Sequence, residues 1–497
     1  MTGDSALPVR ASAGAARPPP PDLPSSTFFH HSSAPRVNTD AVIIEALRSQ
    51  YTAHHVTVVP QASCNLLLYA SAGFARMTPL PDGNGGGPGK AGDAVHGAVS
   101  WKRWIPPARR LGGGQGVMAE TVKLGKWVYA WKGIEVLLYV VDGRDGTMSY
   151  PQVVNQYIVN GDNSAEGRRK VDDLIKEATE WGVRLHNEVW VYDQGWWQKS
   201  AELWDSVQSA EWDDVILEPE MKSALISDVQ YFFDNQDTYA RLKVPWKRGI
   251  IYYGPPGNGK TISIKAMMHS LYRRKDPIPT LYVRTLTSFA GPEASLRDIF
   301  FKARQEAPCY LVFEDLDSIV SDNVRSYFLN EVDGLKKNDG ILMVGSTNHL
   351  NRLDPGIAKR PSRFDRKYFF PDPSKEQRTR YARYWQSKLI DNDDIEFPDE
   401  MCTAVAEITD DFSFAYIQEA FVAALLAIAT RRGGNVSYDG NDDGARWAGQ
   451  EWRTDDGSGA KRRGTNGDHP ELDHLVLWRE LKKQVKILRE EMEEKVR

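Results

Sequence analysis

The pattern of apolar and polar residues in the first part of the chain predicts an α+β domain. Two strand-like apolar stretches flank Lys132-Gly133, which is typical of a β-hairpin, and a third such stretch follows. Residues 164–186 then carry apolar side chains at helical spacing, and 188–192 return to a strand-like pattern. The three earlier stretches are 126–131, 135–141 and 157–159. We therefore assign an α+β domain to residues 37–214, with a glycine-rich loop over 78–114.

From residue 215 the pattern changes to apolar strands that alternate with helices. This alternation is typical of a doubly wound parallel sheet, so the fold class expected for 215–373 is α/β. Helical patterns continue over 374–432. Residues 433–470 are rich in glycine and poor in large apolar side chains, which indicates a disordered insertion.

The last segment, 471–497, predicts a charged helix with a single apolar stripe. The stripe covers about two heptads, whereas a coiled coil needs roughly three or four. We therefore expect the helix to dock on its own domain or on a neighbouring subunit. The stripe consists of Trp478, Leu481, Val485, Leu488 and Met492.

Charge and cysteine content narrow the classes of partner and compartment. The 497 residues include 62 basic and 67 acidic side chains, a formal net charge of −5. Such a balance provides no global field for a phosphate backbone, so nucleic acid is not expected as a partner. The three cysteines are scattered and odd in number, which argues against a disulfide framework or a zinc motif and favours a reducing compartment.

The apolar runs are too short to predict a membrane span. None reaches the roughly 18 residues that a spanning helix requires, so we expect no transmembrane segment and a soluble intracellular protein. Residues 1–36 have the composition of a disordered tail. Pro18 to Pro21 oppose the amphipathic helix of a mitochondrial presequence. A cytoplasmic location is therefore expected, and a mitochondrial location is the alternative.

Six tryptophans fall between Trp181 and Trp212. Indole rings supply large contact areas, so this density fits a binding surface. Large aromatic residues are nevertheless buried on average, and core packing of a small domain is the reading that we favour.

A glycine-rich octapeptide follows the strand-like stretch 248–253 and precedes a helical run through Leu271. The octapeptide fits the phosphate-binding pattern GxxxxGK[ST] in its strand–loop–helix context. Its glycines allow backbone N–H groups and the helix N-terminus to face an anion. Lys260 would reach the β- and γ-phosphates of a nucleotide, and Thr261 would place its hydroxyl on Mg²⁺. The loop is Gly254, Pro255, Pro256, Gly257, Asn258, Gly259, Lys260 and Thr261.

Polar side chains end the two apolar strands predicted further along. Glu314 and Asp315 follow 310–313, and Asn348 follows the strand that begins at Ile341. Carboxyl ends of parallel strands share one edge of a sheet, where a phosphate-bound metal and an attacking water would be handled. We expect Glu314, with Thr261, to organise the metal and Asp315 to orient the water. The amide of Asn348 could bond the water or the γ-phosphate.

These motifs, in this order, resemble those of the AAA family of ATPases. The resemblance covers about 215–430 and implies a P-loop NTPase sheet, the AAA large domain, over 215–373, with the family's small helical lid over 374–432. It also implies ATP and Mg²⁺ as cofactors. The matching segments are 254–261 (Walker A), 310–317 (Walker B), 330–334 (a helix-end motif), Asn348 (sensor 1) and 353–366 (the second region of homology).

The resemblance also implies assembly. In that family the arginines that match Arg363 and Arg366 project into the nucleotide site of the neighbouring subunit, where a guanidinium neutralises transition-state charge. A homo-oligomeric ring, taken as a hexamer, is therefore implied, with both residues as arginine fingers. Without the resemblance, they would read as surface arginines in a basic loop with Lys359, Arg360 and Lys367.

Residues 288–291 resemble the aromatic-hydrophobic-glycine pore loop of AAA translocases. A ring of Phe289 side chains could grip an extended polypeptide by apolar contact. A core aromatic at the end of a loop is the equally weighted alternative.

Two details resemble one branch of the family, the Bcs-type mitochondrial chaperones that move folded Rieske protein. The Walker B acids are reversed to Glu314-Asp315, and sensor 1 is followed by His349. The branch's N-terminal membrane helix has no counterpart here, and Phe289 fits the threading branches, which argues against a Rieske role. The reversal also makes the acid expected to polarise water one methylene shorter than usual.

Taken together, the sequence predicts an ATP hydrolase of the AAA type. Lys260, Glu314, Asp315, Asn348, Arg363 and Arg366 are its expected catalytic residues. It would remodel, unfold or translocate a protein client selected by the N-terminal domain. The alternatives are a nucleotide-gated scaffold with weak hydrolysis and a small-molecule kinase.

Overall fold

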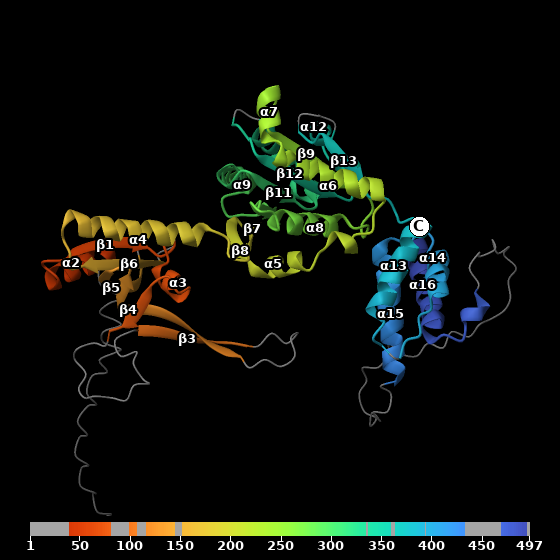
Figure 1. Cartoon of the computed structure of the whole chain (residues 1–497), viewed down its shortest axis with the longest axis horizontal. Coiled ribbons are helices and arrows are strands. Elements are labelled where there is room, and N and C mark those ends of the chain that lie inside the picture. The colour runs from red at the N-terminus through yellow and green to blue at the C-terminus, as the bar shows by residue number, and fades with distance from the viewer. Residues whose placement is uncertain are drawn as a thin grey trace, which may run out of the picture. The chain divides into compact units, whose positions relative to one another are not determined.

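The computed structural model describes eight stretches of the chain (Figure 1). Internal contacts divide the chain into two units, Met1–Arg184 and Leu185–Arg497. The described residues are 39–80, 99–106, 116–144, 152–333, 336–358, 363–392, 394–432 and 469–494. The predicted tail 1–36 and nearly all of the predicted insertion 433–470 lie outside them. Within these stretches, no helix combines the length and the apolar character that crossing a bilayer requires.

The N-terminal unit is built on an antiparallel sheet with the strand order β1-β6-β5-β4-β2, and β3 pairs with the first half of β4. The predicted hairpin is present as β4 and β5. Its turn residues Lys132 and Gly133 both have positive φ angles, 41° and 82°, as a tight two-residue hairpin turn requires. The strands are β1 (His55–Pro60), β2 (Arg76–Pro79), β3 (Val99–Ile105), β4 (Val117–Trp131), β5 (Ile134–Arg144) and β6 (Gln152–Asn160).

Helices pack apolar side chains against both faces of this sheet. The predicted helix is α4 (Ala165–Val183), whose N-cap Ser164 accepts a hydrogen bond from the Gly167 N–H, and it buries Leu174 among strand side chains of one face. Adjacent strand residues point to opposite faces, and those of the other face form a second cluster with Leu47 of α2 (Thr39–Gln50). The remaining helix is α3 (Leu66–Ser71).

One strand lies inside the segment predicted as a glycine-rich loop. β3 occupies residues 99–105 of the range 78–114, because its β-branched and tryptophan residues favour an extended conformation that pairs with β4. The glycine-rich residues 81–98 lie outside the described ranges.

The C-terminal unit contains the predicted doubly wound sheet, with the order β13-β9-β12-β11-β10-β7-β8. All its neighbouring strands are parallel except the β7–β8 pair. Its strands are β7 (Val189–Asp193), β8 (Trp196–Ser200), β9 (Lys247–Tyr253), β10 (Thr280–Val283), β11 (Cys309–Phe313), β12 (Ile341–Thr347) and β13 (Arg366–Phe369).

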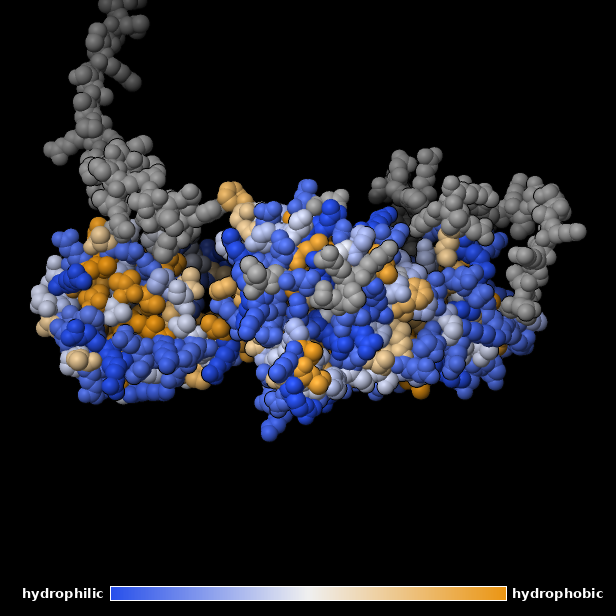
Figure 2. All heavy atoms as spheres, turned by 90° about the horizontal axis from the view of Figure 1, so that it is seen from above, coloured by the Kyte–Doolittle hydropathy of each residue, from blue (hydrophilic) through white to orange (hydrophobic). Residues whose placement is uncertain are grey.

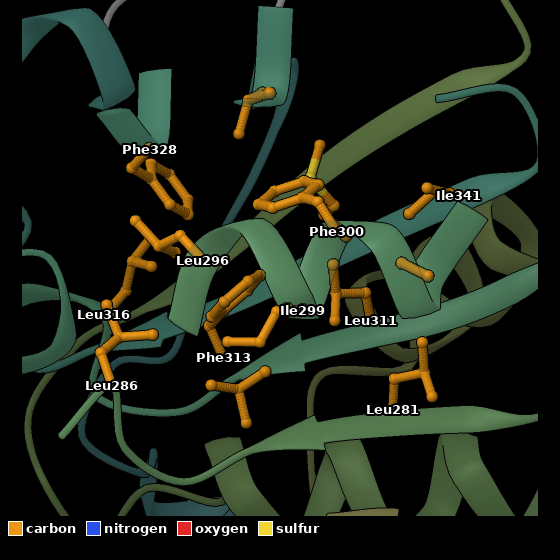
Figure 3. Close-up of a cluster of buried hydrophobic side chains, with 14 of the residues drawn as sticks. Leu281, Leu286, Leu296, Ile299, Phe300, Leu311, Phe313, Leu316, Phe328 and Ile341 are labelled. Carbon is orange, nitrogen blue, oxygen red and sulfur yellow. The ribbon is translucent and has the colours of Figure 1, made fainter. Parts of the chain in front are cut away.

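Each face of the parallel sheet is covered by helices and forms its own apolar core. In Figure 3, Ile299 and Phe300 of α9 lie against Leu311 and Phe313 of β11. The opposite face packs against α6 and α8. The helical elements of this domain are α5 (Ala201–Gln208), η2 (Trp212–Asp214), α6 (Pro219–Asp234), α7 (Gln236–Leu242), α8 (Lys260–Tyr272), α9 (Pro292–Glu306), α10 (Leu316–Ile319), α11 (Asp322–Asp333), η3 (Leu350–Arg352) and α12 (Pro355–Ala358).

The boundary between the units differs from the sequence expectation. The strand predicted at 188–192 is present as β7, but it pairs in parallel with β10 of the α/β sheet and not with the N-terminal sheet. β8 continues the same sheet through an antiparallel hairpin. The division therefore falls after Arg184, about thirty residues before the predicted position, because strand pairing outweighs position along the chain.

Most of the clustered tryptophans pack in apolar cores, as the favoured reading expected. Trp190 and Trp197 lie against one core of the α/β domain, and Trp204 and Trp212 against the other. The cores that they complete belong mainly to the α/β domain and not to a small separate one. Trp196, at the β7–β8 turn, is 71% exposed.

The helices after the sheet share one apolar core, and we call this group of helices the lid. The stripe that begins at Trp478 is buried against α14 and α15, so α16 docks on its own domain, which confirms one of the two arrangements expected for it. Ser374 and Gln377 form a capping box at the start of α13. The lid consists of α13 (Lys375–Lys388), α14 (Asp399–Ile408), α15 (Phe414–Arg432), η4 (Pro470–Leu472) and α16 (Val476–Glu494).

Candidate active site

The glycine-rich loop connects β9 to α8 in the predicted strand–loop–helix order. Gly254, Gly257 and Gly259 have φ angles of 145°, 81° and 90°, which L side chains rarely adopt. A Cβ on Gly254 would lie 2.2 Å from the Phe370 carbonyl oxygen. Glycine is therefore required both for the backbone conformation and for close packing, and the loop is a concave cradle at the N-terminus of α8.

Lys260 is only 8% exposed although its side chain carries a charge. Its Nζ donates hydrogen bonds of 2.8 Å to the carbonyl oxygens of Gly254 and Pro255. Burial lowers the pKa of this ammonium group, while the carboxylates of Asp315 and Asp317 act in the opposite direction. An ammonium group has three N–H donors, so an anion held by the loop would supply a third acceptor to Lys260.

A cavity of about 540 Å³ lies against the loop. It brings together seven of the predicted site residues: Pro256, Gly257, Gly259, Lys260, Thr261, Asp315 and Asn348. The lid supplies aromatic side chains on another part of the wall, which are Tyr381, Tyr384 and Phe414. The backbone N–H of Ala415 donates to the Gly257 carbonyl at 3.2 Å, so the lid contacts the phosphate loop directly.

The two acids that follow β11 are placed differently from each other. Asp315 lines the loop cavity, with a positive φ of 51°, and its backbone N–H donates to the Ser346 hydroxyl at 3.2 Å. Glu314 accepts a hydrogen bond from the Tyr282 hydroxyl and lines a neighbouring cavity of about 580 Å³, which Asp315 also borders. Of the two residues expected on a metal, Thr261 lines the loop cavity and Glu314 does not.

Asp317 is a residue that the sequence analysis did not select. Its carboxylate accepts a 2.7 Å hydrogen bond from the Thr347 hydroxyl, which in turn accepts from the backbone N–H of His349 at 2.9 Å. Asn348 lies between these two positions and lines the cavity. The sequence could have indicated this residue, because Asp317 is a third acid only two positions after Asp315.

The two arginines selected from the sequence are in different environments. Arg363 is 9% exposed, and its guanidinium donates to the Asp333 carboxylate at 2.6 Å and to the Gly356 carbonyl at 2.7 Å. Arg366 is 54% exposed in its side chain, with one ion pair at 3.2 Å to Asp228. Arg363 is therefore engaged within its own subunit, whereas Arg366 remains accessible.

Phe289 lies at a loop between β10 and α9 and is 98% exposed. The base of the loop is fixed by hydrogen bonds of 2.9 Å from the Ser288 hydroxyl to the Gly291 carbonyl and from the Ser295 hydroxyl to Ser288. The alternative of a core aromatic is therefore wrong for this residue.

This arrangement defines a class of protein. A parallel sheet whose carboxyl edge carries a glycine loop, an acidic strand end and an asparagine strand end is a P-loop nucleotide-binding domain. Residues 250–372 match the family model described as "ATPase family associated with various cellular activities (AAA)". The match begins in β9 and ends just before α13, so this part of the chain is similar to an AAA domain.

Proposed function

We propose that this chain binds and hydrolyses ATP as a ring-forming oligomer and uses the energy to remodel a protein client. The observation that carries the proposal is the single cavity that joins Lys260 and Thr261 of the loop, Asp315 after β11 and Asn348 after β12. These groups come from three strand ends, and together they provide phosphate binding, a carboxylate and a polar amide.

ATP fits this cavity because its two ends differ in chemistry. The loop end presents backbone N–H groups and Lys260 to phosphates. Apolar and aromatic side chains, including Ile216, Tyr384 and Phe414, line the remainder and suit an adenine ring. Phosphate binding would redirect the Lys260 ammonium from the loop carbonyls to the β- and γ-phosphates.

Mg²⁺ fits the same site as a partner of the nucleotide. No cluster of three or more potential metal ligands occurs among the described residues, but Mg²⁺ commonly takes only one or two protein ligands besides phosphate oxygens and water. Thr261 would hold it, together with one of the two acids. When bound, Mg²⁺ neutralises charge on the phosphate oxygens.

The residues of this chain would then divide the work of hydrolysis. Asp315 would orient and polarise the attacking water, which its position on the wall of the same cavity as Lys260 supports. Asn348 would contact the γ-phosphate or the water, with its position fixed by the Asp317–Thr347 hydrogen bond. Glu314 would reach the metal only by leaving its hydrogen bond with Tyr282.

Ring assembly, taken as a hexamer, would complete the site. Arg366 is the better candidate to act in trans, because its guanidinium is accessible and held by a single ion pair. The family match supports assembly as an oligomer in general terms. The client would meet Phe289, which is exposed and stands on a braced loop, and the α+β unit would select it.

Phosphate release measured against protein concentration tests the proposal. A ring motor shows turnover per subunit that rises with concentration, because each site needs its neighbour, and Lys260→Ala abolishes it. Arg366→Ala should lower turnover while ATP still binds, and a mixture of Arg366→Ala and Lys260→Ala subunits should regain part of the activity. Turnover that does not depend on concentration would argue against a shared site.

A nucleotide-gated assembly scaffold is the second candidate, and one observation favours it. Glu314 is bound to Tyr282 outside the loop cavity, which leaves Asp315 as the only Walker B acid on the cavity wall. The scaffold would bind ATP tightly and assemble without appreciable phosphate release.

A further inference from the structure

Exposed apolar side chains are concentrated on two paired strands of the N-terminal unit. We call β3 (Val99–Ile105) together with residues 117–124 of β4 the ribbon. Seven of the large apolar residues that the structure leaves exposed lie on it, each between 40% and 64% exposed. They are Val99, Trp101, Trp104, Ile105, Val117, Met118 and Leu124. Soluble proteins rarely expose so many neighbouring apolar groups without a binding role.

Both faces of the ribbon are apolar near its tip. Directly opposed residues of an antiparallel pair share a face, and successive residues alternate between faces. Ile105 is opposed to Val117, and Trp104 is opposed to Met118, so one pair lies on each face. A folded protein partner that packs on one face would leave the other exposed, whereas a fluid interface covers both.

The ribbon is basic, although the whole chain has a net charge of −5. Lys102 and Arg103 are exposed and alternate between the two faces. Lys123 lies 3.8 Å from the centre of the Trp101 ring, and the single acid of the ribbon, Glu120, accepts a hydrogen bond from the Ser100 hydroxyl. The charge is therefore complementary to an anionic surface.

The spacing of these groups matches the depth of a membrane interface. At roughly 3.3 Å per residue, the basic side chains stand about 7–10 Å from Ile105 along the strand. Apolar faces of interfacial elements enter the headgroup region by roughly 5–10 Å. Tryptophan rings prefer this region, and basic side chains bind the anionic headgroups above it.

We propose that the ribbon docks the protein on bilayers that contain anionic lipids. Trp104, Ile105, Val117 and Met118 enter the interface, while Lys102 and Arg103 bind the headgroups. A single-stranded nucleic acid would also meet tryptophan and basic side chains, but Ile105, Val117 and Met118 offer no stacking surface to bases.

The local packing explains how the ribbon keeps its shape without a partner. The ring of Trp104 lies across Gly116, where a Cβ would approach it to 2.1 Å. Trp101 is covered on one side by Lys123, whose ammonium also pairs with Asp142. The tryptophans are therefore held in place before any membrane is met, which lowers the entropy lost on binding.

Flotation of the full chain with vesicles tests the proposal. We expect the protein to float with vesicles of phosphatidylcholine and phosphatidylserine, and at least about tenfold less with phosphatidylcholine alone. Lys102→Glu and Arg103→Glu should each weaken binding by roughly fivefold at low salt, and less at high salt. Trp104→Ser and Met118→Ser should weaken it by about tenfold at any salt.

Matched controls separate membrane docking from the alternatives. Trp196→Ser removes another exposed tryptophan outside the ribbon and should leave flotation unchanged. Phosphate release and the melting temperature report whether a variant folds. If Trp104→Ser disturbs the apolar packing, Lys102→Glu and Arg103→Glu still test the proposal, because they leave that packing intact. Absence of flotation, equal flotation with both vesicles, displacement by single-stranded RNA, or a change of oligomer size in ribbon variants would each overturn the proposal.

Figure 2 shows, on the face it displays, apolar side chains gathered on the N-terminal unit. The ribbon itself is defined by the exposure and pairing of its two strands.

Discussion

The Arg363 guanidinium lies 2.6 Å from the Asp333 carboxylate, inside the subunit that carries both. Lys247 approaches the same carboxylate at 3.2 Å. Burial raises the pKa of the Asp333 carboxyl, but the hydrogen bonds from Arg363 and Lys247 outweigh it and hold the pKa below its usual value. Arg363 thus joins the end of α11 to the segment just before β13. This structural role differs from the arginine finger expected from the sequence.

Removing Arg363 should therefore destabilise the domain. In Arg363→Ala the Asp333 carboxylate loses the guanidinium while the contact with Lys247 stays, and two hydrogen bonds of the guanidinium are lost. We expect a loss of about 2 to 3 kcal/mol in the free energy of unfolding, measured by urea denaturation. Arg366→Ala is the control, because its exposed ion pair should contribute well under about 1 kcal/mol. Equal stability of both variants would contradict the structural role.

Asp315→Asn should retain ATP binding and lose most hydrolysis. Asp315 lines the loop cavity, and removal of a group that orients or deprotonates water commonly costs about 100-fold or more. Single-turnover phosphate release and nucleotide titration separate the two effects. Glu314→Gln is the matched control and should reduce turnover less, because Glu314 does not line the loop cavity. The reverse order would assign the water to Glu314.

Much of the site could be read from the sequence because its parts are local. The octapeptide determines its own loop, and an apolar strand that ends in polar residues delivers them to the sheet edge, as Asp315 and Asn348 show. The departure of Glu314 toward Tyr282 could not be read, because it depends on a neighbouring strand 32 residues away. The burial of Arg363 depends likewise on Asp333, which lies 30 residues earlier.

The fold shows the same limit at a larger scale. Hairpin β4–β5 and helix α4 follow from turn chemistry and apolar spacing, which are local signals. Which sheet receives β7 is decided by pairing with β10, about ninety residues later, and no local pattern carries that information. The sequence analysis missed the ribbon for a related reason. The short strand β3 stands among glycine-rich residues, and its pairing with β4 is not a local signal.

Gly257→Ala should weaken ATP binding by disturbing the contact between loop and lid. A Cβ at this position would lie 2.5 Å from the Ala415 Cβ, and the φ of 81° is strained for alanine. We expect at least about a tenfold rise in the dissociation constant, since roughly 1–3 kcal/mol of strain would be relieved by opening the cavity. Gly133→Ala has a similar φ of 82° with no atom within 4 Å and should leave the nucleotide affinity unchanged. Equal affinities for Gly257→Ala and the parent would show that the lid contact is dispensable.

The stability of the lid should fall as pH rises above neutrality. The ring nitrogens of His469 lie 2.8 Å from the carboxylates of Glu407 and Glu471, to which the protonated ring donates. The hydrogen bond to Glu407 has the largest effect, followed by that to Glu471, and they raise the pKa of the imidazole above its usual 6.5. A raised pKa means that the folded state favours the protonated ring. The contribution is therefore fully present below about pH 6.5 and is lost as pH passes the higher folded pKa.

We expect the melting temperature to drop by about 1–3 °C more in the parent than in His469→Gln between pH 6 and pH 8, consistent with a partly exposed ion pair. Calorimetry at constant ionic strength measures this difference. The same pH dependence in both proteins would assign it to another group.

Phe289→Ala should uncouple ATP hydrolysis from a polypeptide client. The side chain is 98% exposed, so its removal leaves no cavity and should not change the melting temperature. A permanently unfolded polypeptide, such as reduced and alkylated casein, should stimulate phosphate release in the parent. In the variant the ratio of stimulated to basal release should fall to about one, because gripping by apolar contact is lost. Phe301→Ala removes an exposed phenylalanine from α9 and should keep the parent's ratio. If both variants keep that ratio, Phe289 does not grip the client and remodelling must be sought at another surface.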